Sequence, residues 1–370
     1  MMKKITVIAL ILLAIFPLAR TVYLQREHLL LPFDLKTIEY GYNLSHYAKP
    51  DGAWIADEIL FAYASWKYIN GDSPIMLNPE NPPLGKYIVG LSIILFNNEK
   101  LPNLVFQFLS LYSLFILAKL ILKSSALALI PPVLLSWEKL FLEQLIFVPL
   151  FETFSFTFLC LTIYFYLLGS KKNKYFILSS VFLGLLWATR PWMATVPLIL
   201  SFTLHSFLVE KNISKLVRWI AAIPVAVVVL LASYHRLLIS GASVYKVLSV
   251  QKWILWYHQS RLINIGTVWP LLYLNRWYVW WGDQPFIPMP QWNILWPVFT
   301  TLALFLVVLI IFKKIKYEPA VLLIIFWVLS YLIFLSIGNV SSRYIIYLAP
   351  FCYILGIYLL KQLYLNLNDS

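Results

Sequence analysis

Charged residues are scarce in this chain of 370 residues, where Asp, Glu, Lys and Arg together make up only 12% of the sequence. Soluble domains carry roughly 25% charged and about 45–50% apolar residues, whereas 61% of this chain is hydrophobic. A soluble fold has no interior large enough to bury that much apolar surface. The composition therefore excludes a soluble or disordered chain and predicts an integral membrane protein.

Cysteine and glycine are also rare, with 2 and 12 copies. Cys160 and Cys352 both lie inside apolar runs, so we interpret them as core residues rather than as a disulfide. Twelve glycines are few for the tightly packed, rocking helices of a transporter. These two shortages exclude a disulfide scaffold and disfavour a transport function.

Acidic residues number 16 against 29 Lys and Arg, which gives a formal net charge of +13. In a soluble protein this excess would indicate nucleic-acid binding. In a membrane protein the positive-inside rule explains basic residues that flank hydrophobic runs. Such bases are Lys171, Lys172, Lys174, Lys211, Lys215, Arg218, Lys313, Lys314 and Lys316. We therefore expect membrane lipids, and no nucleic acid, as partners.

Long hydrophobic runs predict an all-α polytopic fold with about ten to twelve crossings. The first run, Ile5 to Leu24, follows two lysines and predicts a cytoplasmic N-terminus, with a signal peptide as the alternative. The run at 84–97 predicts a second crossing that ends in an inside turn at 98–100. Residues 175–209 are too long for one span, and Arg190-Pro191 predicts a break at an outer turn. The number of crossings in 125–209 stays open.

Two long loops fall on the outer side of this topology. Residues 25–83 hold eight of the 16 acidic residues, and Ala53–Ile69 within them predicts an amphipathic helix that Asn70-Gly71-Asp72 ends. Residues 235–291 form the second loop, and residues 253–296 hold eight of the 15 tryptophans. These indoles suit either an interfacial aromatic belt or stacking against a sugar or lipid.

The first outer loop contains the pattern that carries chemistry. Asp57-Glu58 is followed, about twenty residues later, by Asn-Pro-Glu-Asn-Pro-Pro-Leu-Gly-Lys at 78–86. Adjacent carboxylates beside a membrane are costly unless they are used or paired, and Pro82-Pro83 fixes an extended backbone before the next helix. Carboxylates beside a cation suit a reaction that needs a general base and an anion clamp. The alternative is that the acids solvate a helix and the prolines cap the next one.

Asp57-Glu58 with Pro82-Pro83-Leu84-Gly85-Lys86 resembles the protein O-mannosyltransferases, which carry His-Pro-Pro-Leu-Gly-Lys there. Glu80-Asn81-Pro82-Pro83 is similar to the Glu-Lys-Pro-Pro of the bacterial lipid A aminoarabinose transferases. Both belong to the GT-C glycosyltransferases. This chain differs from the protein O-mannosyltransferases in two ways. Asn81 stands where those enzymes have the histidine before Pro-Pro, and the second outer loop is too short for the large soluble insert that they carry there.

Three further positions resemble motifs of these GT-C relatives. Glu152 heads an apolar helix, Thr189-Arg190-Pro191 resembles their helix break, and Ser342-Arg343-Tyr344 with Pro350 resembles their entry to a late helix. The resemblance implies a GT-C-like bundle, with a catalytic transmembrane module over 1–234 that includes loop 25–83. Two further regions complete the predicted domain organisation. They are the Trp-rich outer loop 235–291 and the C-terminal transmembrane helices 292–370.

The resemblance also implies an inverting transfer of a sugar from a polyprenyl- or dolichyl-phosphate donor to an acceptor hydroxyl on a lipid, glycan or protein. The reaction is expected on the outer or luminal face of a plasma or ER-type membrane, with a mannose-like hexose as the first choice and a pentose as the other. Asp57 matches the general base, and Glu58 is expected to orient a substrate. The expected phosphate ligands are Lys86, Arg190 and Arg343, with snorkelling to lipid headgroups as the alternative role.

Substrate positioning is expected from a third set of residues, which are Glu80, Asn81, Glu152, Arg261 and Arg276. No cofactor is required, although Glu80 and His258 are candidate ligands for a divalent metal ion. A lipid-linked sugar flippase or transporter without transferase chemistry is the alternative function. The absence of an internal repeat in the sequence disfavours it.

Overall fold

The computed structural model describes residues 2–46, 55–190, 192, 194–211, 213–259, 264–279, 286–315, 317–338 and 340–368. Within these ranges, six helices are long and apolar enough to cross a membrane, or seven if one bent pair forms a single span. The long ones are α1 (Met2–Leu24), α6 (Leu101–Leu122), α9 (Glu152–Gly169), α12 (Ile213–Ser233), α17 (Pro319–Ser336) and α18 (Ala349–Asn368), the last preceded by η3 (Ser342–Tyr347).

Shorter apolar helices fill the rest of the bundle. The bent pair joins α7 (Ser125–Ser136) to α8 (Lys139–Leu142) and η1 (Glu143–Leu145) at 71°. The others are α5 (Leu84–Phe96), α10 (Lys174–Thr189), α11 (Thr195–Leu204) with η2 (His205–Val209), and α16 (Leu295–Ile311). The predicted break at Arg190 is confirmed, because α10 ends at Thr189 and α11 begins at Thr195. The predicted all-α polytopic membrane fold is confirmed as well.

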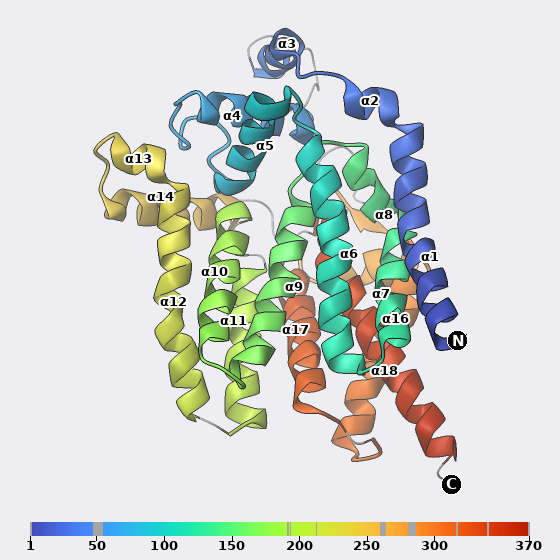
Figure 1. Ribbon diagram of the computed structural model, residues 1–370. Helices are drawn as coiled ribbons and strands as arrows, with labels where there is room; N and C mark the ends of the chain where they lie inside the picture. The colour runs from blue at the N-terminus through green and yellow to red at the C-terminus, as the bar shows by residue number, and fades with distance from the viewer. Residues whose placement is uncertain are drawn as a thin grey trace.

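The bundle has two distinct ends (Figure 1). The end where α2 (Arg26–Leu30), α3 (Leu35–His46), α4 (Asp57–Ile69) and α5 gather is called the site end below. The basic turns after α6, α9, η2 and α16 lie at the opposite end, called the far end. Lys123, Lys171, Lys172, Lys211, Lys313 and Lys314 belong to those turns. This grouping of bases at one end matches the pattern that the positive-inside rule describes.

Helix α5 does not connect the two ends, so the predicted crossing at 84–97 is wrong. The turn after α5 lies beside α2 and the segment that follows it, because Phe33 N donates to Asn97 O at 2.7 Å and Asn98 Nδ2 donates to Leu29 O at 2.7 Å. Thirteen residues at about 1.5 Å each are also too short for a hydrocarbon core of roughly 30 Å. The turn at 98–100 therefore lies at the site end, not at the far end with the basic turns.

Helix α4 covers the predicted amphipathic segment from Asp57 to Ile69, while residues 53 and 54 lie outside the described part of the chain. Its buried face contains Phe61 and Tyr68. Asn70 caps it, and Gly71 follows at a φ of +113°, a conformation that glycine adopts without a steric penalty. Tyr63 joins α4 to α3, because its hydroxyl donates to Glu39 Oε1 at 3.0 Å.

The second outer loop consists of α13 (His235–Ile239), α14 (Val244–Gln259), α15 (Val268–Leu274) and a small antiparallel pair, β1 (Trp277–Tyr278) with β2 (Phe286–Ile287). Several of its indoles are structural: Trp277 Nε1 donates to Val340 O at 2.8 Å and Trp292 Nε1 to Leu272 O at 3.0 Å. Trp256 is exposed, and Trp280 and Trp281 lie outside the described residues. The two cysteines are buried free thiols, as expected.

A buried carboxylate holds the break between α7 and α8. Glu138 is 1% exposed and accepts hydrogen bonds from Trp296 Nε1 at 3.0 Å and from the hydroxyl of Tyr353. Through these bonds the bend is attached to both α16 and α18. An unpaired buried donor costs about 1–3 kcal/mol, so this carboxylate stabilises the contact among three helices.

We expect Glu138→Ala to destabilise the bundle by about 1–3 kcal/mol for each donor that it leaves unpaired. Thermal unfolding in detergent measures the effect, and Glu138→Gln, which keeps an accepting oxygen, is expected to lose less. Glu27→Ala is the control because the Glu27 side chain is 91% exposed. Equal unfolding temperatures for wild type and Glu138→Ala would contradict this assignment.

Candidate functional site

Residues far apart in the sequence form an ion network at the site end of the bundle. Asp57 begins α4, Glu152 begins α9, and Arg343 lies in η3. The Arg343 guanidinium donates to Asp57 Oδ2 and lies 3.7 Å from Glu152 Oε1. One arginine therefore links the predicted general base to a buried carboxylate on another helix.

Glu152 is the centre of this network. Its side chain is 0% exposed, and its Oε1 also accepts a hydrogen bond from Arg190 Nη2 at the end of α10. Arg190 Nη1 donates to Asn81 Oδ1 at 2.9 Å, and its guanidinium lies 5.9 Å from the centre of the Phe61 ring. Burying these charges is tolerable only because they are paired and hydrogen-bonded. The pairing thus fixes where α9 and α10 meet the first outer loop.

Lys86 lies in a pocket of oxygens made by the first outer loop. It is 0% exposed, and its Nζ donates to Asn78 O at 2.6 Å and Asn81 O at 2.9 Å. The hydroxyl of Tyr68 accepts a third, longer bond of 3.3 Å. These acceptors are neutral, and burial lowers the pKa of Lys86 to about 7, while the nearby Glu80 carboxylate acts in the opposite direction.

Glu80 and Tyr68 complete this part of the site. Glu80 Oε1 accepts a hydrogen bond from Asn78 Nδ2, which places a third carboxylate beside the loop that holds Lys86. The Tyr68 hydroxyl donates to the carbonyls of Pro74 and Leu77. Burial raises the pKa of Tyr68 well above its ordinary value, so the phenol stays neutral and keeps the loop closed around Lys86.

The three predicted phosphate ligands thus lie in one connected network, each with a different set of partners. Lys86 is held by carbonyls, Arg190 by Glu152 and Asn81, and Arg343 by Asp57 and Glu152. A phosphate that binds the arginines therefore competes with carboxylates, whereas at Lys86 it competes only with neutral oxygens. Lys86 is completely buried, however, so a phosphate reaches it only when the loop around it opens.

The other predicted site residues have no hydrogen bond or ion pair with this network among the residues that the structure describes. Glu58 is half-buried on α4. Arg276 lies in the second outer loop, where its guanidinium is 5.0 Å from the centre of the Phe286 ring. Arg261 lies outside the described residues, and so does the side chain of His258, whose backbone belongs to α14. Their predicted roles stay predictions.

The described residues do not assemble a metal site. No group of three or more His, Cys, Asp and Glu side chains that could hold a metal ion occurs among them. Glu80, the predicted ligand, is hydrogen-bonded to Asn78 instead. The divalent ion expected at Glu80 and His258 therefore lacks a ligand set in the part of the chain that the structure describes.

Two contributors were not foreseen from the sequence, Asn78 and Tyr68. Asn78 adopts a positive φ of 47° and supplies both a carbonyl for Lys86 and an amide for Glu80. Asparagine tolerates this conformation better than most residues, and the Asn-Pro pair at 78–79 is a turn signal. That signal was present, but nothing in the sequence relates the turn to the Lys86 ammonium.

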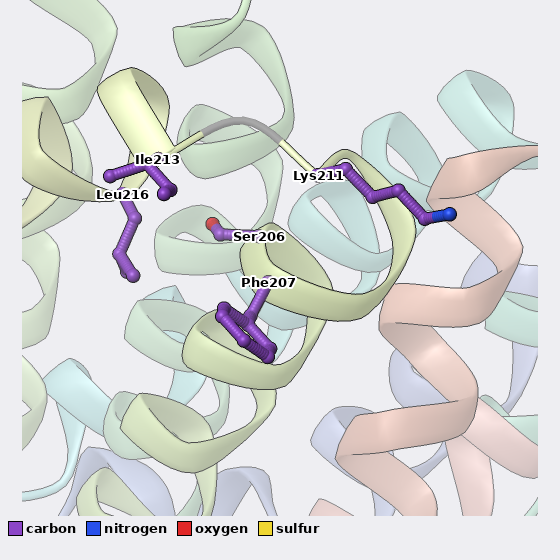
Figure 2. A pocket seen from close by; sticks show the side chains of 5 residues that line it. All are labelled: Ser206, Phe207, Lys211, Ile213 and Leu216. Carbon is purple, nitrogen blue, oxygen red and sulfur yellow. The ribbon is translucent and has the colours of Figure 1, made fainter.

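A hollow of about 190 Å³ lies away from this network, at the far end of the bundle (Figure 2). It is lined by Ser206, Phe207, Lys211, Ile213 and Leu216, from η2 and the start of α12. In Figure 2 the Lys211 side chain extends away from the other four. The lining thus offers little beyond apolar surface and one hydroxyl, so this hollow is not the reactive centre.

The fold and the ion network together define an all-α polytopic membrane protein with a buried charged site at one end of its bundle. No family model and no curated protein sequence matches the chain. Among solved structures, the chain is similar to ArnT from Cupriavidus metallidurans, whose crystal structure is bound to undecaprenyl phosphate. The TM-score is 0.61 at 15% sequence identity, and the match covers 89% of this chain and 59% of ArnT.

This likeness shows the fold, which is the GT-C fold that the sequence resemblance implied. The chain spans less than two thirds of the length of ArnT. At 15% identity the likeness does not carry the activity of ArnT over to this chain. The function therefore depends on what the residues of the site can do.

Proposed function

We propose that this protein is an inverting GT-C glycosyltransferase that moves a sugar from a polyprenyl-phosphate donor to an acceptor hydroxyl. The observation that carries the proposal is the junction of Asp57, Glu152, Arg190 and Arg343 with the Lys86 loop at one end of the bundle. It combines a carboxylate that can act as the general base with Lys and Arg side chains that can bind a phosphate. Such a transfer requires both. The ArnT fold supports it, since that protein's structure holds undecaprenyl phosphate.

Asp57 is the general base of the proposed reaction. Its carboxylate removes the proton from the acceptor hydroxyl, and the oxygen attacks the anomeric carbon of the sugar. The bond from that carbon to the phosphate oxygen breaks, and its electron pair leaves with the lipid phosphate. Attack from the face opposite the leaving group inverts the anomeric centre.

Lys86, Arg190 and Arg343 stabilise the charge that develops on the leaving phosphate. Arg343 contacts Asp57, so the base and one phosphate ligand belong to the same site. Substrate binding must separate them in the proposed reaction, because an inverting displacement places the base and the leaving phosphate on opposite faces of the anomeric carbon. Glu152 fixes the two arginines, while Asn81 and Glu80 orient the loop around Lys86. The proposed steps involve only these side chains. In the proposed topology, the site end faces the cell exterior, periplasm or lumen.

We expect Lys86→Gln to raise the KM for a polyprenyl-phosphate sugar by about 10- to 100-fold, because a charge-assisted hydrogen bond contributes about 1.5–3 kcal/mol and each 1.4 kcal/mol is a factor of about ten. Glutamine removes the charge and keeps N–H donors for the carbonyls of Asn78 and Asn81, but its side chain is one bond shorter, so the unfolding temperature is measured alongside the KM. Arg343→Ala is expected to weaken donor binding as well. Donor titrations with purified protein measure both.

The matched control for these variants is Lys67→Gln. Lys67 lies in the same outer loop, is partly exposed, and is 3.7 Å from Asp72, so its loss should leave the donor KM unchanged. Unchanged donor KM values in both Lys86→Gln and Arg343→Ala would move the phosphate site elsewhere.

A radiolabelled polyprenyl-phosphate sugar separates the proposed enzyme from a lipid-linked sugar flippase. In proteoliposomes, the enzyme produces free polyprenyl phosphate and a labelled acceptor, whereas a flippase moves the labelled lipid unchanged between leaflets. The acceptor is supplied as a membrane extract, so that lipid, glycan and protein acceptors are all present. Label movement without release of lipid phosphate would refute the proposed function.

A further inference from the structure

An aromatic cluster lies beside the ion network, where α5, the break between α10 and α11, and the start of the second outer loop meet. It comprises Tyr87 on α5, Trp187 at the end of α10, Trp192, Tyr234 and His235 where α12 meets α13, and Gln251 on α14. The Tyr87 and His235 rings are 4.9 Å apart, as are the Trp187 and Trp192 rings. Gln251 Nε2 donates to the Tyr234 hydroxyl at 2.9 Å, and Trp192 Nε1 donates to Gln251 O at 3.3 Å.

This aromatic cluster adjoins the proposed phosphate ligands on two sides. Tyr87 follows Lys86 in the chain, and its ring is 5.8 Å from that of Tyr68, whose hydroxyl accepts a bond from Lys86. On the other side, Trp187 and Trp192 flank Arg190 in the sequence. Tyr87 therefore lies near the tyrosine that contacts Lys86, and the two tryptophans lie near Arg190 in the chain.

Three polar atoms in the aromatic cluster are buried without a hydrogen-bond partner among the described residues. They are the Tyr87 hydroxyl, Trp187 Nε1 and Gln251 Oε1. Gln251 as a whole is only 3% exposed. Buried polar atoms are nearly always paired, and an unpaired one calls for an unseen water or ligand. These three together offer a donor, an acceptor and a hydroxyl that can act as either.

The backbone at Trp192 adds a second observation. Its φ is +35°, a conformation that costs energy for a bulky residue and that is concentrated at ligand-binding sites. Its indole contacts Trp187, and its Nε1 bonds to the Gln251 backbone by a long hydrogen bond. Trp192 therefore joins the end of α10 to α14 while it holds this strained conformation.

We infer that the aromatic cluster is a saccharide subsite, in which a sugar ring stacks on Trp192 and exchanges hydrogen bonds with Tyr87, Trp187 and Gln251. Sugars present apolar C–H faces edged by hydroxyls, and aromatic rings with polar tips are the complementary surface. The inference rests on the proposed function and adds its sugar-binding element. The ring bound there belongs either to the donor or to a glycan acceptor.

The test uses two variants of the full-length protein, Tyr87→Phe, which removes only the hydroxyl, and Trp187→Phe, which removes the indole N–H together with one ring. If the orphaned polar atoms serve no ligand, replacing them with apolar groups is neutral or stabilising. In a saccharide subsite, each change instead raises a substrate KM by about 5- to 10-fold, since a hydrogen bond contributes about 1 kcal/mol. The unfolding temperature of Tyr87→Phe is expected to stay equal or rise, which separates lost binding from lost folding, whereas Trp187→Phe also loses packing against Trp192.

Trp219→Phe is the matched control. The Trp219 indole nitrogen is equally buried and unpartnered among the described residues, but its ring packs against Tyr166 and Phe202, on the segments that lead into the far end. Its KM values should match those of wild type. A rise in the KM for polyprenyl-phosphate mannose alone identifies the donor sugar, and a rise for the acceptor alone identifies an acceptor glycan.

A binding measurement keeps this inference separate from the proposed function. Saturation-transfer-difference NMR with free mannose and free arabinose detects binding by the purified protein without any turnover. We expect a signal from at least one sugar that Tyr87→Phe and Trp187→Phe reduce and Trp219→Phe does not. If the sugar binds but is never transferred, the proposed function fails and the subsite stands. Unchanged KM values, or signals that are absent or equal in all variants, would overturn the subsite.

Discussion

Asp57→Asn is expected to abolish sugar transfer while leaving the protein folded. The asparagine still offers an oxygen to Arg343 in place of Asp57 Oδ2, so the contact between α4 and η3 persists. It cannot accept the proton of the acceptor hydroxyl, however, and loss of a general base reduces turnover by about 10²- to 10⁴-fold. The measurement is release of polyprenyl phosphate under saturating donor, together with donor binding, which should stay near the wild-type value.

Asp72→Asn is the control for this substitution. Asp72 lies in the same outer loop with its side chain 47% exposed, and it pairs only loosely with Lys67 at 3.7 Å. Its loss should change turnover less than twofold. Turnover at the wild-type rate in Asp57→Asn would show that the base is a different group.

Glu152→Ala is expected to have the largest effect on stability. Its carboxylate is completely buried and contacts both Arg190 and Arg343, so its removal leaves two guanidinium groups without their shared anion. Breaking a buried ion pair by removing one partner costs about 3–5 kcal/mol. We expect the unfolding temperature in detergent to fall by about 5–10 °C, and the donor KM to rise because the arginines lose their orientation.

The comparison for Glu152 is Glu318→Ala, which removes an exposed pair at the far end. Glu318 Oε1 lies 2.6 Å from Lys123 Nζ, and both side chains are exposed. Surface pairs contribute about 0–1 kcal/mol, so this variant should unfold within about 2 °C of wild type. Similar losses in both variants would mean that Glu152 is not the centre of a buried network.

The sequence predicted most of the fold because hydrophobic runs and breaks are local properties. The all-α membrane class, the long spans and the break at Arg190 were all foreseen. The first outer helix was foreseen with an end at Asn70-Gly71-Asp72, where the structure ends α4. The exception was the segment at 84–97, where apolar composition alone does not distinguish a crossing from a short helix that stays at one end.

Most residues of the candidate site were singled out from the sequence, but their arrangement was not. Asp57, Glu80, Asn81, Lys86, Glu152, Arg190 and Arg343 were all singled out from local motifs. The motifs did not show that Arg343 bridges Asp57 and Glu152, or that neutral carbonyls surround Lys86. They also left the aromatic cluster unassigned, since Tyr87, Trp187 and Gln251 belong to no motif.

The sequence by itself determined that this chain is a membrane protein and where most of its long apolar helices lie. It also singled out the few charged residues that lie away from the basic turns. Hydropathy and chain-breaking residues act over a few neighbours, so they can be read without the fold. Only the tertiary structure decided which charges meet, because Arg343 and Asp57 are 286 positions apart. Their contact depends on how η3, α9 and α10 pack against the first outer loop, and in a buried site that packing decides which ion pairs form.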